Sequence, residues 1–293
     1  MAYATYYGRA LRWAIFLRPL RPDATLWNLL KATIIGFTAV VLLGRPGEFV
    51  RPYLISVKEA VPMSSQLAMW FLERIFDLLF ALLIFGYGLS RVQSSQAHVG
   101  SALQWTFQVG GGVVWGVSVI CLILLVLLRQ HPRLFQSRLM DSLSFLPARH
   151  SERVEKIIAS FLEGVESIRG GRSLLLVIAY SFLEWILIAA CYFCIMRSFH
   201  GFFDFGLIDL FIYMGFVSFG TIVQLPGIGG GLQVVSVIVL HELFGIPMET
   251  ASGVALITWI TTCIALLPVG VPLAFHEGLN WRALKTIREE SSL

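Results

Sequence analysis

The sequence contains few charged residues: Lys, Arg, Asp and Glu together make up 14% of its 293 residues, whereas 57% are hydrophobic. Soluble domains usually carry about a quarter charged residues, so this scarcity excludes a water-soluble monomer with a polar surface. It also excludes an intrinsically disordered chain, because disorder requires low hydrophobicity. The composition therefore indicates a polytopic membrane protein.

Cysteine is also scarce, with four residues that all lie in long apolar runs: Cys121, Cys191, Cys194 and Cys263. This excludes a disulfide-rich scaffold. Cys191 and Cys194 form a C-x-x-C pair, but no second pair and no histidine accompany it, so we interpret these cysteines as small buried hydrophobic residues. We therefore expect no metal site and no cofactor.

The net charge of +4 raises the question of nucleic-acid binding. Cytoplasmic loops of membrane proteins collect Lys and Arg, and this explains a small positive excess. The sequence has no zinc-finger, RNP or basic-zipper pattern. We expect membrane lipids as partners and no nucleic acid.

Six stretches are apolar enough to form all or part of a spanning helix, which needs about 20 residues. They cover residues 26–43, 63–89, 102–128, 173–196, 207–225 and 249–275, and residues 3–17 form a shorter, arginine-containing seventh candidate. We predict an all-α fold, a polytopic membrane helix bundle that forms a single domain over residues 1–293.

Two regions combine a glycine- and proline-rich break with a following piece too short to span. The break residues that we single out are Gly44 and Gly47 in the first region, and Pro226, Gly227, Gly229, Gly230 and Gly231 in the second. Irregular backbone at membrane depth is tolerated only inside protein or beside a wet cavity. We therefore predict two re-entrant broken hairpins, in which glycine permits close approach of the backbone.

The loops predict the orientation. Residues 129–172 are rich in Arg and Lys and include an amphipathic helix over residues 151–168, so they are expected on the cytoplasmic side, as is the C-terminal tail. The hairpins then enter from opposite faces, which predicts an inverted repeat formed by residues 26–89 and 207–275. We expect a multi-pass protein of the plasma (inner) membrane with a cytoplasmic C-terminus.

The charged residues inside this apolar chain are the candidate functional residues, because charges within membrane segments are costly. Arg45, Glu48 and Arg51 surround the first break. If a helix starts near Gly47, Glu48 lies in its first turn and Arg51 one turn on, beside Glu48.

A second charged group, Glu73, Arg74 and Asp77, lies in the long segment at residues 63–89, with Arg74 and Asp77 at helical i, i+3 spacing. Arg binds phosphate through paired hydrogen bonds. We predict that Arg45, Arg51 and Arg74 bind a lipid phosphate headgroup, organised by Glu48 and Asp77. The alternative is a set of internal salt bridges near the interface.

These motifs resemble a known family. Gly44-x-x-Gly47-Glu48-x-x-Arg51, Glu73-Arg74-x-x-Asp77 and Pro226-Gly227-x-Gly229-Gly230-Gly231 look like the lysylphosphatidylglycerol synthase transmembrane region, also called the flippase-like domain family. The resemblance implies a membrane bundle that handles or translocates a lipid. The chain departs from the family at Gln233 to Ser236, where members often carry a Glu, and at Trp259, where they often carry an Arg.

The first functional hypothesis is therefore a flippase-like protein that binds or translocates an anionic lipid, with no catalytic residue and no enzymatic activity. Two alternatives stay open. The chain could be a membrane enzyme acting on a lipid phosphate, with carboxylates as acid and base. It could also be a scaffold for a separately encoded lipid-modifying enzyme, and a homo-oligomer is a further candidate assembly.

Overall fold

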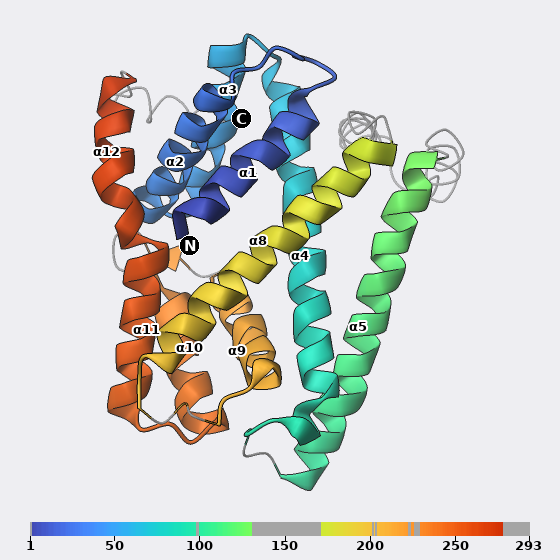
Figure 1. Ribbon diagram of the computed structural model, residues 1–293, viewed down its shortest axis with the longest axis vertical. Coiled ribbons are helices and arrows are strands. Elements are labelled where there is room, and N and C mark those ends of the chain that lie inside the picture. Colours follow the sequence, from blue (N-terminus) through green and yellow to red (C-terminus); the bar gives the residue numbers. More distant parts are fainter. Residues whose placement is uncertain are drawn as a thin grey trace, which may run out of the picture.

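The computed structural model describes residues 2–97, 100–130, 171–200, 202, 204–221, 224–225 and 229–277. The amphipathic helix expected at residues 151–168, the cation-rich tail after residue 277, and Pro226 and Gly227 lie outside the described residues. The described part is a helix bundle (Figure 1), which confirms the all-α prediction, apart from two paired two-residue strands.

The first half of the chain contains α1 (Ala2–Leu17), α2 (Leu26–Leu43), the 3₁₀ turn η1 (Arg45–Phe49), α3 (Val50–Glu59), α4 (Met63–Ser90), the 3₁₀ turn η2 (Val92–Ser94) and α5 (Ser101–Gln130). The second half contains α8 (Gly171–Arg197), α9 (Leu207–Gly220), β1 (Gln224–Leu225), β2 (Gly229–Gly230), α10 (Gly231–Ile238), the π-helical turn η3 (Val239–Leu243), α11 (Met248–Thr262), the 3₁₀ turn η4 (Ile264–Leu266) and α12 (Leu267–His276).

Within the described residues, four segments are long and apolar enough to cross a membrane: Leu26–Leu43, Leu103–Leu124, Ser173–Arg197 and Met248–His276. The protein is thus a multi-pass membrane protein. Helix α4 has 28 residues, or about 42 Å at 1.5 Å per residue. It also runs the length of the bundle (Figure 1), although it carries Glu73, Arg74 and Asp77.

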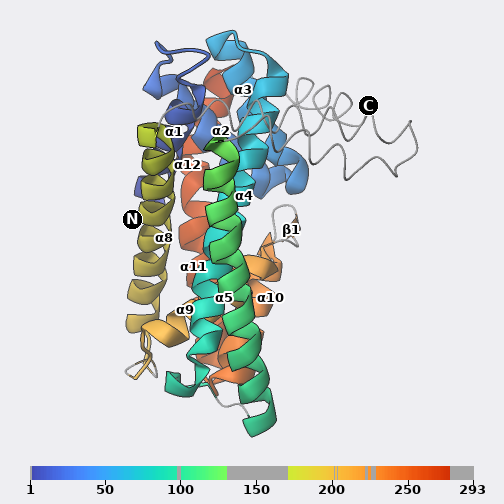
Figure 2. The same ribbon diagram turned by 90° about the vertical axis from the view of Figure 1, so that its right-hand side faces the viewer.

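The two broken regions occupy opposite halves of the bundle. Helices α2 and α3 lie beside the end where α12 finishes, whereas α9 and α10 lie toward the end where α11 begins (Figures 1 and 2). Each half has its own hydrophobic cluster, one around Trp13 and Phe76 and the other around Tyr213 and Leu240. Re-entry from the two membrane faces and the inverted repeat stay predictions.

The first break differs in detail from the expectation. A helix was expected to start near Gly47, but residues 45–49 form the 3₁₀ turn η1, and α3 starts only at Val50. Gly44 ends α2 with a φ of 71°, a conformation that glycine adopts without the steric cost of a Cβ. Pro46 follows in the first turn of η1, where its missing N–H is not needed.

Two expected long segments in the second half are shorter or interrupted. The stretch at 207–225 is helical only as far as Gly220, where a Cβ atom would lie 2.7 Å from the carbonyl oxygen of Gly231. The stretch at 249–275 is interrupted at Cys263 and η4. Pro268 follows this interruption and lacks the N–H that a continuous helix would bond to an earlier carbonyl.

The last described residue, Glu277, joins the end of α12 to the first half. Its Oε1 lies 3.0 Å from Nζ of Lys31 in α2, and its Oε2 lies 2.6 Å from Nζ of Lys58 in α3. These ion pairs hold α2 and α3 against the end of α12.

Candidate functional site

Seven charged side chains from four helices meet inside the half of the bundle that contains α1–α3. They comprise Arg9 and Arg12 from α1, Arg51 from α3, Glu73, Arg74 and Asp77 from α4, and Glu184 from α8. We call this set the buried ion network. It contains four arginines and three carboxylates, so its formal charge is 4 − 3 = +1.

Glu73 and Arg12 form the centre of the network, and both side chains are completely buried. Arg12 donates to Oε1 of Glu73 at 2.7 Å and to Ser181 Oγ at 2.9 Å, and it lies 2.8 Å from Oδ1 of Asp77. Burying charges costs several kcal/mol per ion unless they are paired and hydrogen-bonded. This pairing is what allows α1, α4 and α8 to carry charges inside an apolar bundle.

Arg51 and Arg74 also pair with Glu73, through its Oε2 atom. Arg51 lies 3.0 Å from Oε2 of Glu73 and stacks over the Trp13 ring at 4.1 Å from its centroid. Arg74 lies 3.4 Å from Glu73 and 3.0 Å from Asp77. The Nε–H groups of Arg51 and Arg74 are buried and have no hydrogen-bond partner in the described part of the chain.

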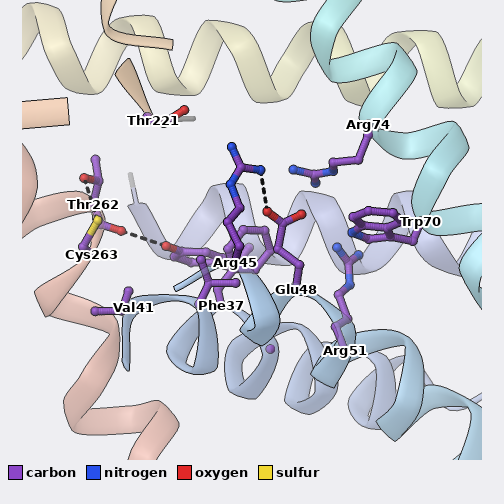
Figure 3. Close-up of a pocket in the computed structure, with 13 residues that line it drawn as sticks. Phe37, Val41, Arg45, Glu48, Arg51, Trp70, Arg74, Thr221, Thr262 and Cys263 are labelled. Atoms are coloured by element: carbon purple, nitrogen blue, oxygen red, sulfur yellow. Dashed lines mark hydrogen bonds and ion pairs between the residues drawn. The ribbon is translucent and has the colours of Figure 1, made fainter. Parts of the chain in front are cut away.

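A cavity with a volume of about 170 Å³ lies in front of these two arginines (Figure 3). One water needs about 10–15 Å³ by the same measure, so the cavity has room for a group of several heavy atoms. Figure 3 shows Arg45 and Arg74 directed toward Glu48 from opposite sides, with Arg51 below Trp70. The cavity wall thus presents three guanidinium groups and one carboxylate.

The rest of the cavity wall is mainly apolar and comes from both halves of the chain. The lining residues other than the charged ones are Tyr6, Gly36, Phe37, Val40, Val41, Trp70, Thr221, Thr262 and Cys263. Thr221 follows the end of α9, and Cys263 interrupts the helix between α11 and α12. The cavity therefore touches the break at η1 and two further helix ends.

The structure places the predicted charged residues in two layers. Arg45, Glu48, Arg51 and Arg74 line the cavity, whereas Glu73 and Asp77 lie behind it as partners of the arginines. The Arg74–Asp77 pair at i, i+3 spacing is present at 3.0 Å. Arg45 and Glu48, which are also three residues apart, lie 2.9 Å from each other.

The expectation that Arg51 lies beside Glu48 is wrong, because the two side chains pair with different residues. Glu48 belongs to η1 and pairs with Arg45, whereas Arg51 is in the first turn of α3 and pairs with Glu73 of α4. The 3₁₀ geometry of η1 rotates Glu48 away from the face of α3 on which Arg51 lies.

The described break residues take different positions in the fold, and none of them is among the residues that line the cavity. Gly44 directly precedes Arg45, and Gly47 follows two residues later in η1. The Cα of Gly47 packs so closely on the α2 backbone at Ala39 that no Cβ would fit. Gly229 and Gly230 form β2, and Gly231 begins α10. The Oε1 of Gln233 accepts a hydrogen bond from the backbone N–H of Gly230 at 3.4 Å.

Sequence reasoning missed three members of the buried ion network: Arg9, Arg12 and Glu184. Arg9 pairs with Asp77 at 3.4 Å and with Glu184. The signal was present, because Glu184 is an isolated charge within an apolar span and such charges are expected to face a partner. The partners are more than 170 residues away in the sequence, and spacing rules for a single helix do not reach that far.

The fold and the cavity together define a class: a multi-pass membrane protein with a paired-charge cavity between two broken halves. The family described as Lysylphosphatidylglycerol synthase TM region matches residues 1–270, and the chain belongs to this family. No curated protein and no solved structure gave a match.

Proposed function

We propose that this protein binds the phosphate headgroup of an anionic membrane lipid in the cavity and translocates that lipid across the membrane. Membership of the family supports a role in handling lysylphosphatidylglycerol-type lipids or other phospholipids. The observation that carries the proposal is the group of three arginines, Arg45, Arg51 and Arg74, on one wall of a cavity at the helix breaks.

The charge balance favours an anionic ligand. The buried ion network has an excess of one positive charge, and Arg45 and Glu48 add no net charge because they pair with each other. An anion in the cavity would offset this excess and offer acceptors to the guanidinium groups. Arg binds phosphate through paired, charge-assisted hydrogen bonds, which makes a phosphate group a better fit than a neutral ligand.

The cavity volume of about 170 Å³ fits a headgroup and not a whole lipid. The acyl chains must therefore remain outside, in contact with the hydrocarbon around the bundle. Binding of the headgroup between two halves that each contain a broken hairpin is the arrangement from which alternating access proceeds in transporters built from repeats.

Enzymatic turnover of the lipid phosphate is the less favoured alternative. General acid–base catalysis requires a carboxyl group that can exchange a proton with the substrate. Glu48, Glu73 and Asp77 are each within 3.5 Å of an arginine nitrogen and are thus engaged in ion pairs. Such carboxylates suit the positioning of arginines better than proton transfer.

Arg74 provides the test, because its side chain is 34% exposed and reaches the cavity from the middle of α4. We would reconstitute the protein in vesicles of phosphatidylcholine and phosphatidylglycerol and measure the translocation of fluorescent phosphatidylglycerol. Loss of a charge-assisted hydrogen bond typically costs about 1.5–3 kcal/mol. Arg74→Gln should therefore reduce translocation about 10- to 100-fold at low lipid concentration.

Arg91→Gln is the matched control. It removes the same charge from the position just after the C-terminal end of α4, where Arg91 is exposed and lies over the Tyr87 ring. The proposal is refuted if Arg74→Gln transports lipid at the control rate and only its stability falls. Accumulation of a chemically changed lipid would favour the enzyme, and neither transport nor turnover in the wild type would favour the scaffold.

A further inference from the structure

The structure contains a second cavity, which shares no lining residue with the first. Its volume is about 620 Å³, and α4, α5, α8 and α9 form its walls. Leu83 and Ile84 of α4 line it between Trp115 of α5 and Ala190 of α8. Figure 1 shows α5 and α8 on either side of α4 in this half of the molecule. We call this cavity the lateral groove.

Helix α5 packs closely against α4 at one edge of the lateral groove. A Cβ at Gly86 would lie 2.6 Å from the backbone nitrogen of Trp115, and a Cβ at Gly111 would lie 2.5 Å from the Cβ of Leu89. These glycines allow α5 to approach α4 closely. Helix α8 contacts α4 much less extensively than α5 does, so the surface of α4 between α5 and α8 remains as the floor of the groove.

The chemistry of the lining excludes a charged or strongly polar occupant. Among the described residues that line the groove none is charged, and the wall is formed by aliphatic and aromatic side chains. Burying an unpaired charge or an unbonded polar group against such a wall costs several kcal/mol. Apolar cavities of this kind do not hold ordered water well. Two lining residues, Tyr87 and Trp185, carry a polar atom, and the indole N–H of Trp185 has no hydrogen-bond partner in the described part of the chain. Most of the occupant must therefore be hydrocarbon.

The groove opens onto the surface that faces lipid. Phe182, Ile186 and Leu207 line it and are 59%, 46% and 61% exposed. Both α5 and α8 contain segments apolar and long enough to cross a membrane. The groove is thus continuous with the part of the protein that contacts acyl chains in the bilayer.

The length of the groove matches one leaflet. Its lining residues on α8 extend from Phe182 to Phe193, a separation of 193 − 182 = 11 residues, or about 16 Å along the helix. Half of the hydrocarbon core of a bilayer is about 15 Å thick. We propose that the lateral groove is a binding site for one hydrocarbon chain of a membrane lipid from the leaflet on the α9 side.

Photo-crosslinking tests this site directly. The protein would be reconstituted in phosphatidylcholine vesicles that contain phosphatidylcholine with a diazirine on one acyl chain, and labelled residues would be located by mass spectrometry. Leu83, on the groove floor, should be labelled well above Leu72, which is 1% exposed in the core. Equal labelling of Leu83 and Leu72 would overturn the proposal.

Filling the groove should remove the label. Ala190→Trp places an indole in the groove, and we expect loss of labelling at Leu83. Leu175→Trp is the matched control, because Leu175 is 67% exposed on the same helix and does not line the groove. Ile186→Trp is a second filling variant at an exposed wall position, where a large side chain is tolerated. Unchanged labelling in both filling variants would refute the proposal.

Two further outcomes distinguish an acyl chain in the groove from a second protein copy there and from headgroup binding in the charged cavity. Cysteine crosslinks between two copies at the groove, without lipid labelling of Leu83, would show that a second copy occupies it and would overturn the proposal. Arg74→Gln should leave labelling of Leu83 unchanged, because the lateral groove and the charged cavity share no lining residue. Failure of headgroup binding is therefore distinguishable from failure of the groove proposal.

Discussion

Replacing Glu73 by Gln would remove one negative charge from the centre of the buried ion network without changing the shape of the side chain. Glu73 is completely buried and lies within 3.4 Å of nitrogen atoms of Arg12, Arg51 and Arg74. The network charge rises from +1 to +2. The amide –NH₂ of Gln cannot accept a hydrogen bond, so it faces a guanidinium group where a carboxylate oxygen stood before.

The largest cost falls on Arg51. In the described part of the chain its carboxylate partner is Glu73, and its side chain is only 5% exposed. Removing one partner of a buried ion pair typically costs about 3–5 kcal/mol. The stacking of Arg51 on Trp13 is present in both proteins and does not offset the loss. Glu73→Gln should therefore lower the free energy of unfolding by about 3–5 kcal/mol.

Unfolding of the purified protein in mixed micelles, titrated with a denaturing detergent, measures this change. The double variant Glu73→Gln/Arg51→Met removes the charge left without a partner. It should be less destabilised than the sum of the two single variants, with a coupling of about 1–3 kcal/mol. Arg18→Met, at an exposed position after α1, should change stability by less than about 0.5 kcal/mol. A loss below about 1 kcal/mol for Glu73→Gln would refute the view that Glu73 compensates these arginines.

Three further variants test other parts of the fold. Glu277 accepts hydrogen bonds from two lysines, which lower its pKa below the ordinary 4.5. As pH falls below about 4.5, the wild type should therefore lose stability relative to Glu277→Gln in pH-dependent unfolding. No difference between the two proteins would contradict a stabilising role for these ion pairs. Gly36→Ala should destabilise the protein and impair lipid binding, because the new Cβ would lie 2.5 Å from the Cβ of Arg51. Gly112→Ala is the control and should be neutral in the same assays, because a Cβ at Gly112 would point into open space. Tyr213→Phe removes a buried hydrogen bond of 2.6 Å to Ser236 of α10. It should lower the free energy of unfolding, measured with a denaturing detergent, by about 1 kcal/mol. A change near zero would contradict this prediction.

Local sequence patterns predicted most helices well because each is a long apolar run that ends at a glycine, a proline or a polar loop. The first spanning helix was predicted at residues 26–43 and is found at Leu26–Leu43, since Gly44 stops it. Breaks within apolar runs were harder to predict. The interruption at Cys263 depends on Pro268 and on packing, and hydropathy alone continues through it.

The small-residue pair Gly112 and Gly116 shows the same limit. Their small-xxx-small spacing predicts a helix-packing face, but among the described residues neither glycine has a neighbour within 4 Å of an added Cβ. The close contact of α5 with α4 uses Gly111 instead. Which glycine of α5 faces α4 depends on how α5 is rotated about its own axis. The packing of α5 against α4 determines this rotation, so spacing within α5 alone does not predict it.

The sequence by itself determined that this is a membrane helix bundle and which charges stand inside apolar segments, because both follow from composition and from spacing within one helix. It also determined the local pair of Arg74 with Asp77. Only the tertiary structure decided that Arg9, Arg12 and Glu184 complete the network. Their partners come from different helices, and the need to pair every buried charge selects which helices meet.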